Sequence, residues 1–342
     1  MRRRPAKIPP LLPTFAALIS VALCTHNGAR YLGAQLRSIC AQSLPPTEIV
    51  LSDDASSDET VSLARDVLSE SLANRPGITI ELRILENQSA LRVTKNFEQA
   101  VRACKGELIA LSDQDDVWHP DRLRIMAAEF ERRPGLTLLH SDARLVDDAG
   151  QPLGQALFQA LEVRPFELEW IHAGRAFGVL LRRNLVTGAT AMFRRSLLGP
   201  ALPFPREWLH DEWLAAIAAV TGEVDALEQQ LIDYRQHASN AVGASRPTLT
   251  QNLRRAFASR GNKQHERLRR VERLMERLEA IAAPKSALDA VQAKLAHQRF
   301  RAALPDGRLF RVLPIAREAF SGRYDRYDRG LQAVAADLFE SP

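Results

Sequence analysis

The densest group of reactive side chains lies in "LSDQDDVW", where Asp113, Asp115 and Asp116 occur within four positions. They follow an apolar run that is typical of a buried strand. An exposed loop would tolerate the repulsion between these carboxylates, because salt screens it. A hard-cation site would make use of it, because Mg²⁺ and Mn²⁺ bind carboxylate oxygens together with substrate phosphates. This segment alone leaves both interpretations open.

A second acidic pair, Asp53 and Asp54, stands in "SDDASSDET". Ionised carboxylates only accept hydrogen bonds, which suits the N–H groups of a base and the hydroxyls of a ribose. The alternative role is capping of the following helix, which Ser56, Ser57 or Asp58 would fill equally well. The chain has no glycine-rich GxxxxGKS loop, so a metal ion would have to neutralise much of the charge of a bound nucleotide.

The segments that would position these groups alternate between strand and helix. Apolar runs at 18–25, 48–54, 78–87 and 106–113 predict strands, and segments with helical spacing separate them. This alternation predicts an α/β fold with a doubly wound, mostly parallel sheet and right-handed crossovers. Ligands bind such sheets at the carboxyl ends of the strands, and both acidic groups fall at those ends.

The last third of the chain differs in composition. From residue 246 onward there are 20 basic and 11 acidic residues. Leu268, Val271, Leu274 and Leu278 form an apolar stripe that predicts an amphipathic helix. The basic excess would suit anionic lipid, a phosphorylated carrier or nucleic acid, and it is equally typical of solvated helix faces.

Composition and cysteine content narrow the class of protein. The 342 residues are 46% hydrophobic and 25% charged, which is typical of a globular chain with a sizeable core. The three cysteines, Cys24, Cys40 and Cys104, form no CxxC pair, which disfavours a disulfide framework or a zinc site and fits a reducing compartment. Residues 1–15 are basic and interrupted by prolines, so we expect a disordered leader and a cytoplasmic protein.

The ordered set of motifs resembles family 2 glycosyltransferases of the GT-A fold, and among them the bacterial rhamnosyltransferase-like members. The matching segments are, in order, "VALCTHNGARYLGAQLRSICAQS", "EIVLSDDASSDET", "KNFEQAVRACKGELIALSDQDDVWHPDRL", "VTGATAMFRRSLL", "HDEWLA" and "YRQHASNAVG". The resemblance implies a GT-A domain at 16–245, consisting of a Rossmann-like nucleotide-binding half and an acceptor half. A basic, mainly helical extension would follow at 246–342.

The resemblance also assigns roles to residues. Mg²⁺ or Mn²⁺ would be held by Asp115 foremost, with Asp113 and Asp116 as further candidates. Asp211 would be the catalytic base, with Glu212 as the fallback. Contacts to the nucleotide sugar would come from Thr25, Asn27, Asp53, Asp54, Lys95, Asn96, Asp113, Gly188, Arg235 and His237.

Two positions depart from the family pattern. Arg92 stands about where relatives have a glycine, which affects the shape of the loop before "VTKNF". His210 stands where many relatives have Glu, although His occurs in the rhamnosyltransferase-like group.

The function implied by the resemblance is inverting, metal-dependent transfer of a sugar from dTDP-L-rhamnose or a UDP-sugar. The acceptor would be a saccharide or lipid-linked molecule in cell-surface polysaccharide or O-antigen synthesis. The basic extension would then contact anionic membrane at its inner face.

Two other classes of function serve as alternatives. A sugar-phosphate nucleotidyltransferase should carry a glycine-rich, basic loop after the first strand, and "CTHNGARYL" is not such a loop. A non-catalytic protein that binds nucleic acid or another anionic ligand is disfavoured by the few aromatic residues in the basic segment, so no nucleic-acid partner is expected.

Overall fold

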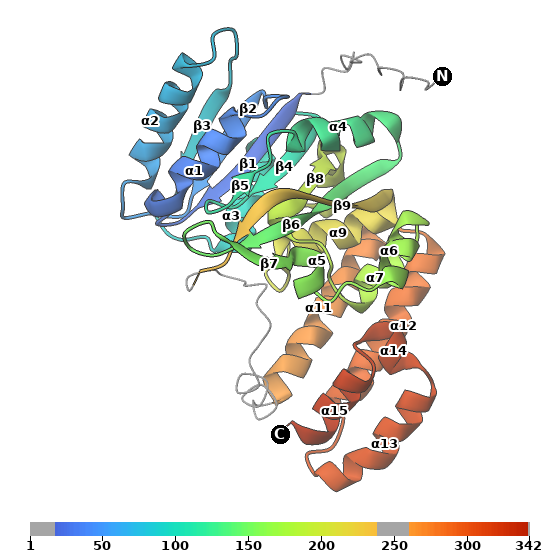
Figure 1. Cartoon of the computed structure of the whole chain (residues 1–342). Coiled ribbons are helices and arrows are strands. Elements are labelled where there is room, and N and C mark those ends of the chain that lie inside the picture. Colours follow the sequence, from blue (N-terminus) through green and yellow to red (C-terminus); the bar gives the residue numbers. More distant parts are fainter. Residues whose placement is uncertain (1–17, 238–259, 341–342) are drawn as a thin grey trace, which may run out of the picture.

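The computed structural model describes residues 18–237 and 260–340 (Figure 1). The expected leader at 1–15 and the expected domain boundary at 245/246 lie outside these residues. The strands are β1 (Ile19–Thr25), β2 (Glu48–Asp53), β3 (Glu81–Glu86), β4 (Leu108–Ser112), β5 (Val117–Trp118), β6 (Leu136–Val146), β7 (Pro152–Ala156), β8 (Ala191–Arg194) and β9 (Glu223–Arg235).

The helices cover the sheet and then continue beyond it. They are α1 (Ala29–Cys40), α2 (Thr60–Ala73), α3 (Val93–Ala103), α4 (Arg122–Arg132), α5 (Leu157–Ala160), α6 (Pro165–His172), α7 (Ala176–Arg182), α8 (Leu198–Ala201), α9 (His210–Thr221), α11 (Arg260–Ala280), α12 (Lys285–Ala302), α13 (Arg308–Phe320), α14 (Arg323–Tyr327) and α15 (Leu331–Phe339). Two 3₁₀ turns, η1 (Gly188–Thr190) and η2 (Arg195–Leu197), flank β8.

The strands form one nine-stranded sheet in the order β3-β2-β1-β4-β8-β6-β9-β5, with β7 paired to β6. The first four strands are parallel to one another, whereas β8 is antiparallel to both of its neighbours. The predicted doubly wound, mostly parallel sheet is therefore confirmed. The carboxyl ends of β1, β2 and β4 meet at one edge, as the sequence predicts.

Helices cover both faces of the parallel strands. Ile19, Val21 and Leu23 of β1 belong to one core with side chains of α1, α2 and α4. Ala22 and Cys24 face the other core, which contains residues of α3 and α9. Because both faces are covered, every residue of β1 is buried. All three cysteines are buried thiols without disulfide bonds.

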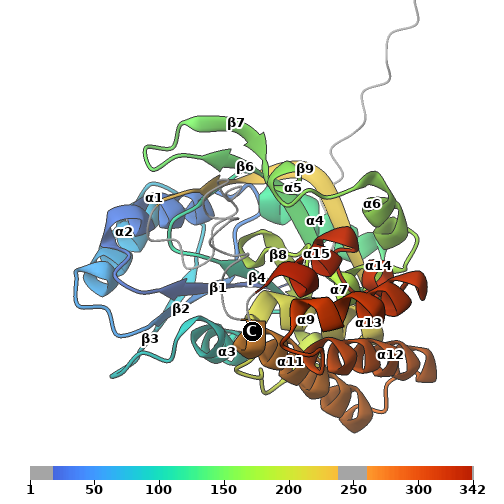
Figure 2. The same cartoon turned by 90° about the horizontal axis from the view of Figure 1, so that it is seen from below.

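The C-terminal helices pack against the sheet domain beside α7 and α9 (Figures 1 and 2). Val271, Leu274 and Leu278 lie in the same core as Trp213 of α9, so the predicted apolar stripe is confirmed. A smaller separate core forms around Leu304, Ile315, Tyr324 and Ala333. In the described parts of the chain, none of the helices combines the length and apolarity needed to cross a bilayer.

Candidate active site

The ends of β1 and β2 are joined by a compact set of hydrogen bonds. The Thr25 hydroxyl donates to Asp53 Oδ1 at 2.7 Å, and Ser56 donates to the same carboxylate through both its backbone N–H and its hydroxyl. Asn27 adopts a positive φ of 47° and accepts from the backbone N–H of Ser57 at 2.9 Å. The structure thus brings Thr25, Asn27 and Asp53 together, as the sequence predicts.

Asp54 holds the loop that precedes α3. Its carboxylate accepts the backbone N–H groups of Leu91 and Arg92 at 2.6 and 2.9 Å. Arg92 has φ 68° and ψ 163°, a conformation that is essentially restricted to glycine. This backbone conformation explains why relatives have a glycine at this position. In this chain the two hydrogen bonds to Asp54 hold the backbone of Arg92 in the same conformation.

Lys95 and Asn96 both bind protein groups. The Lys95 ammonium donates to Glu98 at 2.6 Å and to the carbonyl of Phe204 at 2.7 Å. Asn96 is buried, accepts from the Ser52 hydroxyl at 2.6 Å and donates to the Ser52 carbonyl at 2.9 Å. These contacts anchor α3 to β2 and to the segment before α9.

The three carboxylates after β4 have different surroundings. Asp116 is 1% exposed, and its Oδ1 accepts the backbone N–H of Arg235 at 3.0 Å. Its Oδ2 has no hydrogen-bond donor among the described residues. The opposing charge comes from Arg122, a buried side chain whose guanidinium lies 3.9 Å from the Trp118 ring centroid. Asp116 faces inward.

Asp113 links the acidic motif to the predicted base. Burial, together with the charges of Asp115 and Asp211, raises the pKa of Asp113 to about 7, against the opposing charge of Arg122. Asp113 therefore lies within the electrostatic field of both carboxylates. A cation at this position would favour its ionised form.

Asp115 is paired with a residue far away in the sequence. His237 Nε2 lies 2.7 Å from Asp115 Oδ2, and the imidazole stacks on Tyr31 with ring centroids 4.9 Å apart. The family resemblance assigned His237 to the nucleotide sugar, whereas in the structure it contacts the predicted metal carboxylate directly. Tyr31 was not singled out, because only the packing of α1 against the end of β9 reveals its contact.

The Arg235 side chain donates hydrogen bonds to two turns, one at Asp115 and one at Asp148. Its Nε donates to the backbone carbonyl of Asp115 at 2.8 Å, and its Nη1 donates to that of Asp148 at 2.8 Å. The guanidinium also lies 5.1 Å from the Tyr31 ring centroid. In this arrangement Arg235 positions the loop that carries Asp115, a role different from the expected contact with the donor.

Asp211 lies in the first turn of α9, beside the 3₁₀ turn of Gly188. Its Oδ2 accepts the Gly188 backbone N–H at 2.9 Å, and burial raises its pKa. A Cβ on Gly188 would stand 2.8 Å from His210 Nε2, so the glycine is needed for this close approach. The family resemblance assigned Gly188 to contacts with the nucleotide sugar, whereas its backbone N–H in the structure donates to Asp211 of α9.

His210 and Glu212 flank the predicted base on α9. The His210 ring is stacked on Phe97 at 3.7 Å between centroids, and neither ring nitrogen has a hydrogen-bond partner among the described residues. Burial lowers the pKa of His210 to about 3, so the imidazole is neutral. Glu212 is ion-paired with Arg270 of α11, which makes it less available than Asp211 as a base.

The sheet domain matches a known protein family. Residues 20–199, more than half of the chain, match the family described as glycosyl transferase family 2. An uncharacterized glycosyltransferase of Nostoc sp. is 27% identical over 241 residues, which cover 69% of this chain and 70% of the relative. An uncharacterized Mycobacterium tuberculosis protein is 27% identical over 225 residues, 64% of this chain and 59% of the relative. The matched region thus spans well under two thirds of the mycobacterial relative.

A solved structure has the same fold. The crystal structure of S. aureus TarS 1-349 in complex with UDP-GlcNAc aligns with a TM-score of 0.55 and 16% identity, covering 94% of this chain and 89% of that one. This confirms the expected GT-A-like architecture together with a C-terminal helical region. The family match covers the first four of the ordered motifs, whereas "HDEWLA" and "YRQHASNAVG" lie beyond its last residue. The chain belongs to glycosyltransferase family 2.

Proposed function

We propose that the protein is an inverting, metal-dependent glycosyltransferase that uses a nucleotide-diphosphate sugar. One observation carries the proposal: Asp211 accepts the Gly188 N–H in the turn η1, which contacts β4, the strand that ends just before Asp113, and the charge of Asp211 raises the pKa of Asp113. The predicted metal motif and the predicted base would then share one site at the carboxyl edge of the sheet.

The side chains present fit Mg²⁺ or Mn²⁺. Carboxylate oxygen suits both ions, and His237 Nε2 lies at hydrogen-bond distance, 2.7 Å, from Asp115 Oδ2 and so orients that carboxylate. Among residues 18–237 and 260–340, no three potential ligands surround a single point. Asp115, with Asp113 as a further carboxylate, would hold the cation, and diphosphate oxygens and water would have to complete its coordination, as is typical of Mg²⁺ sites. The bound cation would stabilise the charge of the departing nucleoside diphosphate.

Asp211 would act on the acceptor. Its carboxylate takes the proton of the acceptor hydroxyl while that oxygen forms a bond to the anomeric carbon of the donor. The bond from the anomeric carbon to the diphosphate oxygen breaks in the same displacement, so the configuration inverts and the electron pair leaves with the nucleoside diphosphate. The raised pKa of Asp211 makes it a better proton acceptor than an exposed aspartate.

The edge of β1 and β2 would hold the nucleoside. Thr25, Asn27 and Asp53 meet there, and Asp53 accepts hydrogen bonds. For the sugar we retain L-rhamnose, supplied as dTDP-L-rhamnose, on the strength of the motif resemblance, with UDP-GlcNAc as the comparison donor because TarS has been solved with it. The acceptor would be a saccharide or lipid-linked molecule of the cell surface, and the protein would work at the inner face of the membrane.

The test is a donor panel with purified protein. Release of nucleoside diphosphate is measured for dTDP-L-rhamnose, UDP-GlcNAc and other nucleotide sugars, with Mn²⁺ or with EDTA. We expect turnover of one donor only with the metal, and loss of it in Asp115→Ala and in His237→Ala. Asp66→Ala, on the exposed face of α2, is the matched control.

Two results would overturn the proposal. One is the absence of both turnover and thermal stabilisation with every donor. The other is release of pyrophosphate from a nucleoside triphosphate and a sugar phosphate, which would identify a nucleotidyltransferase.

A further inference from the structure

A cavity of about 280 Å³ lies between the sheet domain and the C-terminal helices. Its walls come from α7, α9, α11, α12 and the residues that follow α14. None of its lining residues belongs to the strands that end at the proposed nucleotide site. Its position therefore makes it a separate feature of the molecule.

Positive charge dominates the lining. Two carboxylates, Glu212 and Asp328, face six cationic side chains: Arg182, Arg183, Arg267, Arg270, Lys294 and Arg329. Some of these cations are neutralised within the protein. Arg182 and Arg183 are ion-paired with Glu167, and Arg270 is ion-paired with Glu212.

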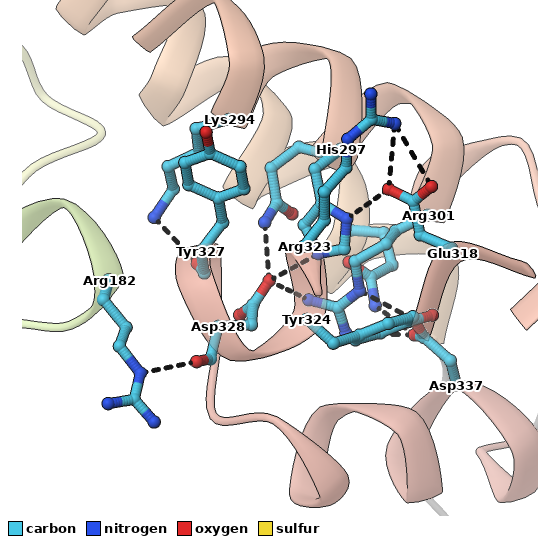
Figure 3. A network of polar contacts seen from close by, with 12 residues as sticks. Arg182, Lys294, His297, Arg301, Glu318, Arg323, Tyr324, Tyr327, Asp328 and Asp337 are labelled. Carbon is cyan, nitrogen blue, oxygen red and sulfur yellow. Dashed lines mark hydrogen bonds and ion pairs between the residues drawn. The ribbon is translucent and has the colours of Figure 1, made fainter. Parts of the chain in front are cut away.

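The remaining cations have no carboxylate of their own in the cavity. Lys294 donates to the backbone carbonyl of Leu181 and to that of Tyr327, and Figure 3 shows the second contact. The Arg267 and Arg329 side chains are exposed, and neither makes a hydrogen bond or ion pair with the residues that the structure describes. The cavity therefore brings positive charges together without a matching anion.

The Asp328 carboxylate also binds a cation outside the cavity lining. It accepts from Arg301 Nη1 at 2.7 Å and from Gln298 at 2.8 Å, and its backbone carbonyl accepts from Arg182 Nε at 2.9 Å (Figure 3). Arg301 is fully buried and is also bonded to Asp337. This network fixes the segment that carries Arg329, and the single charge of Asp328 is shared between Arg301 and the cations of the cavity.

The pKa of Lys294 reflects the excess of positive charge in the cavity. Burial, together with the charges of Arg270, Arg301 and Arg267, lowers the pKa of Lys294 to about 8, against the opposing charge of Asp328. An anion between these groups would relieve their repulsion. Guanidinium groups bind phosphoryl oxygens through paired hydrogen bonds, and an ammonium adds a point charge.

The cavity adjoins the proposed base through α9. Glu212 lines the cavity, while the preceding residue, Asp211, faces Gly188 and the acidic motif. The Trp208 indole, whose Nε1 donates to the Arg270 carbonyl at 2.9 Å, forms another part of the wall. An acceptor with its hydroxyl at Asp211 could thus place a neighbouring group in the cavity.

We infer that this cavity binds a phosphoryl group of the acceptor, so that the enzyme glycosylates a phosphorylated or diphosphate-linked acceptor. The inference rests on the proposed function. A cavity of about 280 Å³ suits one phosphate or diphosphate, whereas a bilayer surface would be contacted by an extended face of the protein. Arg267 and Arg329 make the contacts that are not already used within the protein, and Lys294 supplies charge from the floor.

The test uses inorganic pyrophosphate as the probe, measured by titration calorimetry with the full chain. EDTA is present so that no divalent cation promotes diphosphate binding at Asp115. We expect binding by the wild type and a loss of about tenfold or more in affinity for Arg267→Gln/Arg329→Gln, because each removes charge-assisted hydrogen bonds. Arg269→Gln and Arg326→Gln, exposed cations of α11 and α14 outside the cavity, are matched controls.

Two results of the calorimetry would contradict phosphoryl binding in the cavity. No pyrophosphate binding, or equal affinity in the double variant and the controls, would overturn it. Phosphatidylcholine vesicles with and without phosphatidylglycerol form a second arm, and binding to anionic vesicles through Arg267 and Arg329 without pyrophosphate binding would identify a membrane contact instead. Stabilisation of the wild type by a nucleotide sugar and Mn²⁺ is measured in parallel, so failure of the donor site is distinguished from failure of the cavity.

Discussion

The three carboxylates of the acidic motif, Asp113, Asp115 and Asp116, have different surroundings. Asp116 is buried beside Arg122 and accepts the backbone N–H of Arg235, whereas Asp115 contacts His237, and the charges of Asp115 and Asp211 raise the pKa of Asp113. Sequence spacing treats the three as equivalent, because it carries no information on which way each carboxylate turns. Their separation depends on β9 and α4, which pack around the loop.

The proposed base, Asp211, can be tested with a single substitution. Asp211→Asn removes the proton acceptor and keeps an oxygen for the Gly188 N–H, so the fold should be preserved. We expect the turnover number for transfer to fall by a factor of about 10² to 10⁴, with donor affinity unchanged. Steady-state transfer kinetics and donor titration check this. Glu212→Gln is the comparison, and an equal loss in both variants would contradict the assignment.

His210 predicts a pH dependence of stability. Its pKa is lowered to about 3 in the folded protein, so between that value and its unfolded pKa of about 6.5 the unfolded chain binds the extra proton. The contribution of His210 to stability is therefore fully present above about pH 6.5 and declines as the pH falls, by about 2 kcal/mol at pH 5. Because the raised pKa of Asp113 acts in the opposite direction, the test compares variants: between pH 8 and pH 5, urea unfolding should show the wild type losing more stability, or gaining less, than His210→Gln. Equal declines would show that His210 is not the group responsible.

At the scale of elements, the loop before α3 stores conformational strain. Arg92 occupies a region of φ and ψ that costs a non-glycine residue about 1 to 3 kcal/mol. Arg92→Gly should stabilise the protein by roughly 1 kcal/mol, because relief of strain outweighs the added freedom of the unfolded chain. The midpoint of urea unfolding measures the effect. Arg92→Ala keeps a Cβ and should gain nothing, so an alanine variant as stable as the glycine variant would refute the explanation.

The elements themselves were largely predictable. Alternating apolar runs and helical spacing predicted β1, β2 and β4 because buried parallel strands are apolar on both faces. The edge strand β3 begins at Glu81, later than the expected start at residue 78. Its side chains are only partly buried, so its boundary is set by pairing with β2, which periodicity does not reveal.

At the scale of the whole molecule, the C-terminal helices share a core with the sheet domain. Leu278 of α11 is fully buried in the core that also contains Trp213 and the inner face of β4. Leu278→Ala should cost about 2 to 5 kcal/mol and should destabilise both parts together in one transition. Fluorescence and far-UV circular dichroism during urea unfolding should coincide. Leu309→Ala, 87% exposed on α13, should change stability by less than about 0.5 kcal/mol.

Two separate transitions in that experiment would show that α11 and α12 fold independently of the sheet. The outer core around Leu304, Ile315, Tyr324 and Ala333 is small and would be the first part to open locally. The phosphoryl cavity lies at the boundary between the two parts, so its geometry depends on their joint folding.

The sequence alone determined the order of strands and helices, the family, and the placement of Asp53, Asp54, Asp113 and Asp115 at strand ends, because these follow from local periodicity and motif order. The tertiary structure decided which polar groups meet. His237 reaches Asp115 from 122 positions away, Asp54 is occupied by the backbone of the Arg92 loop, and Arg235 braces two turns. The cationic cavity likewise assembles from α7, α9, α11 and α12. Such contacts depend on sheet register and on the packing of distant helices, and no local pattern encodes either.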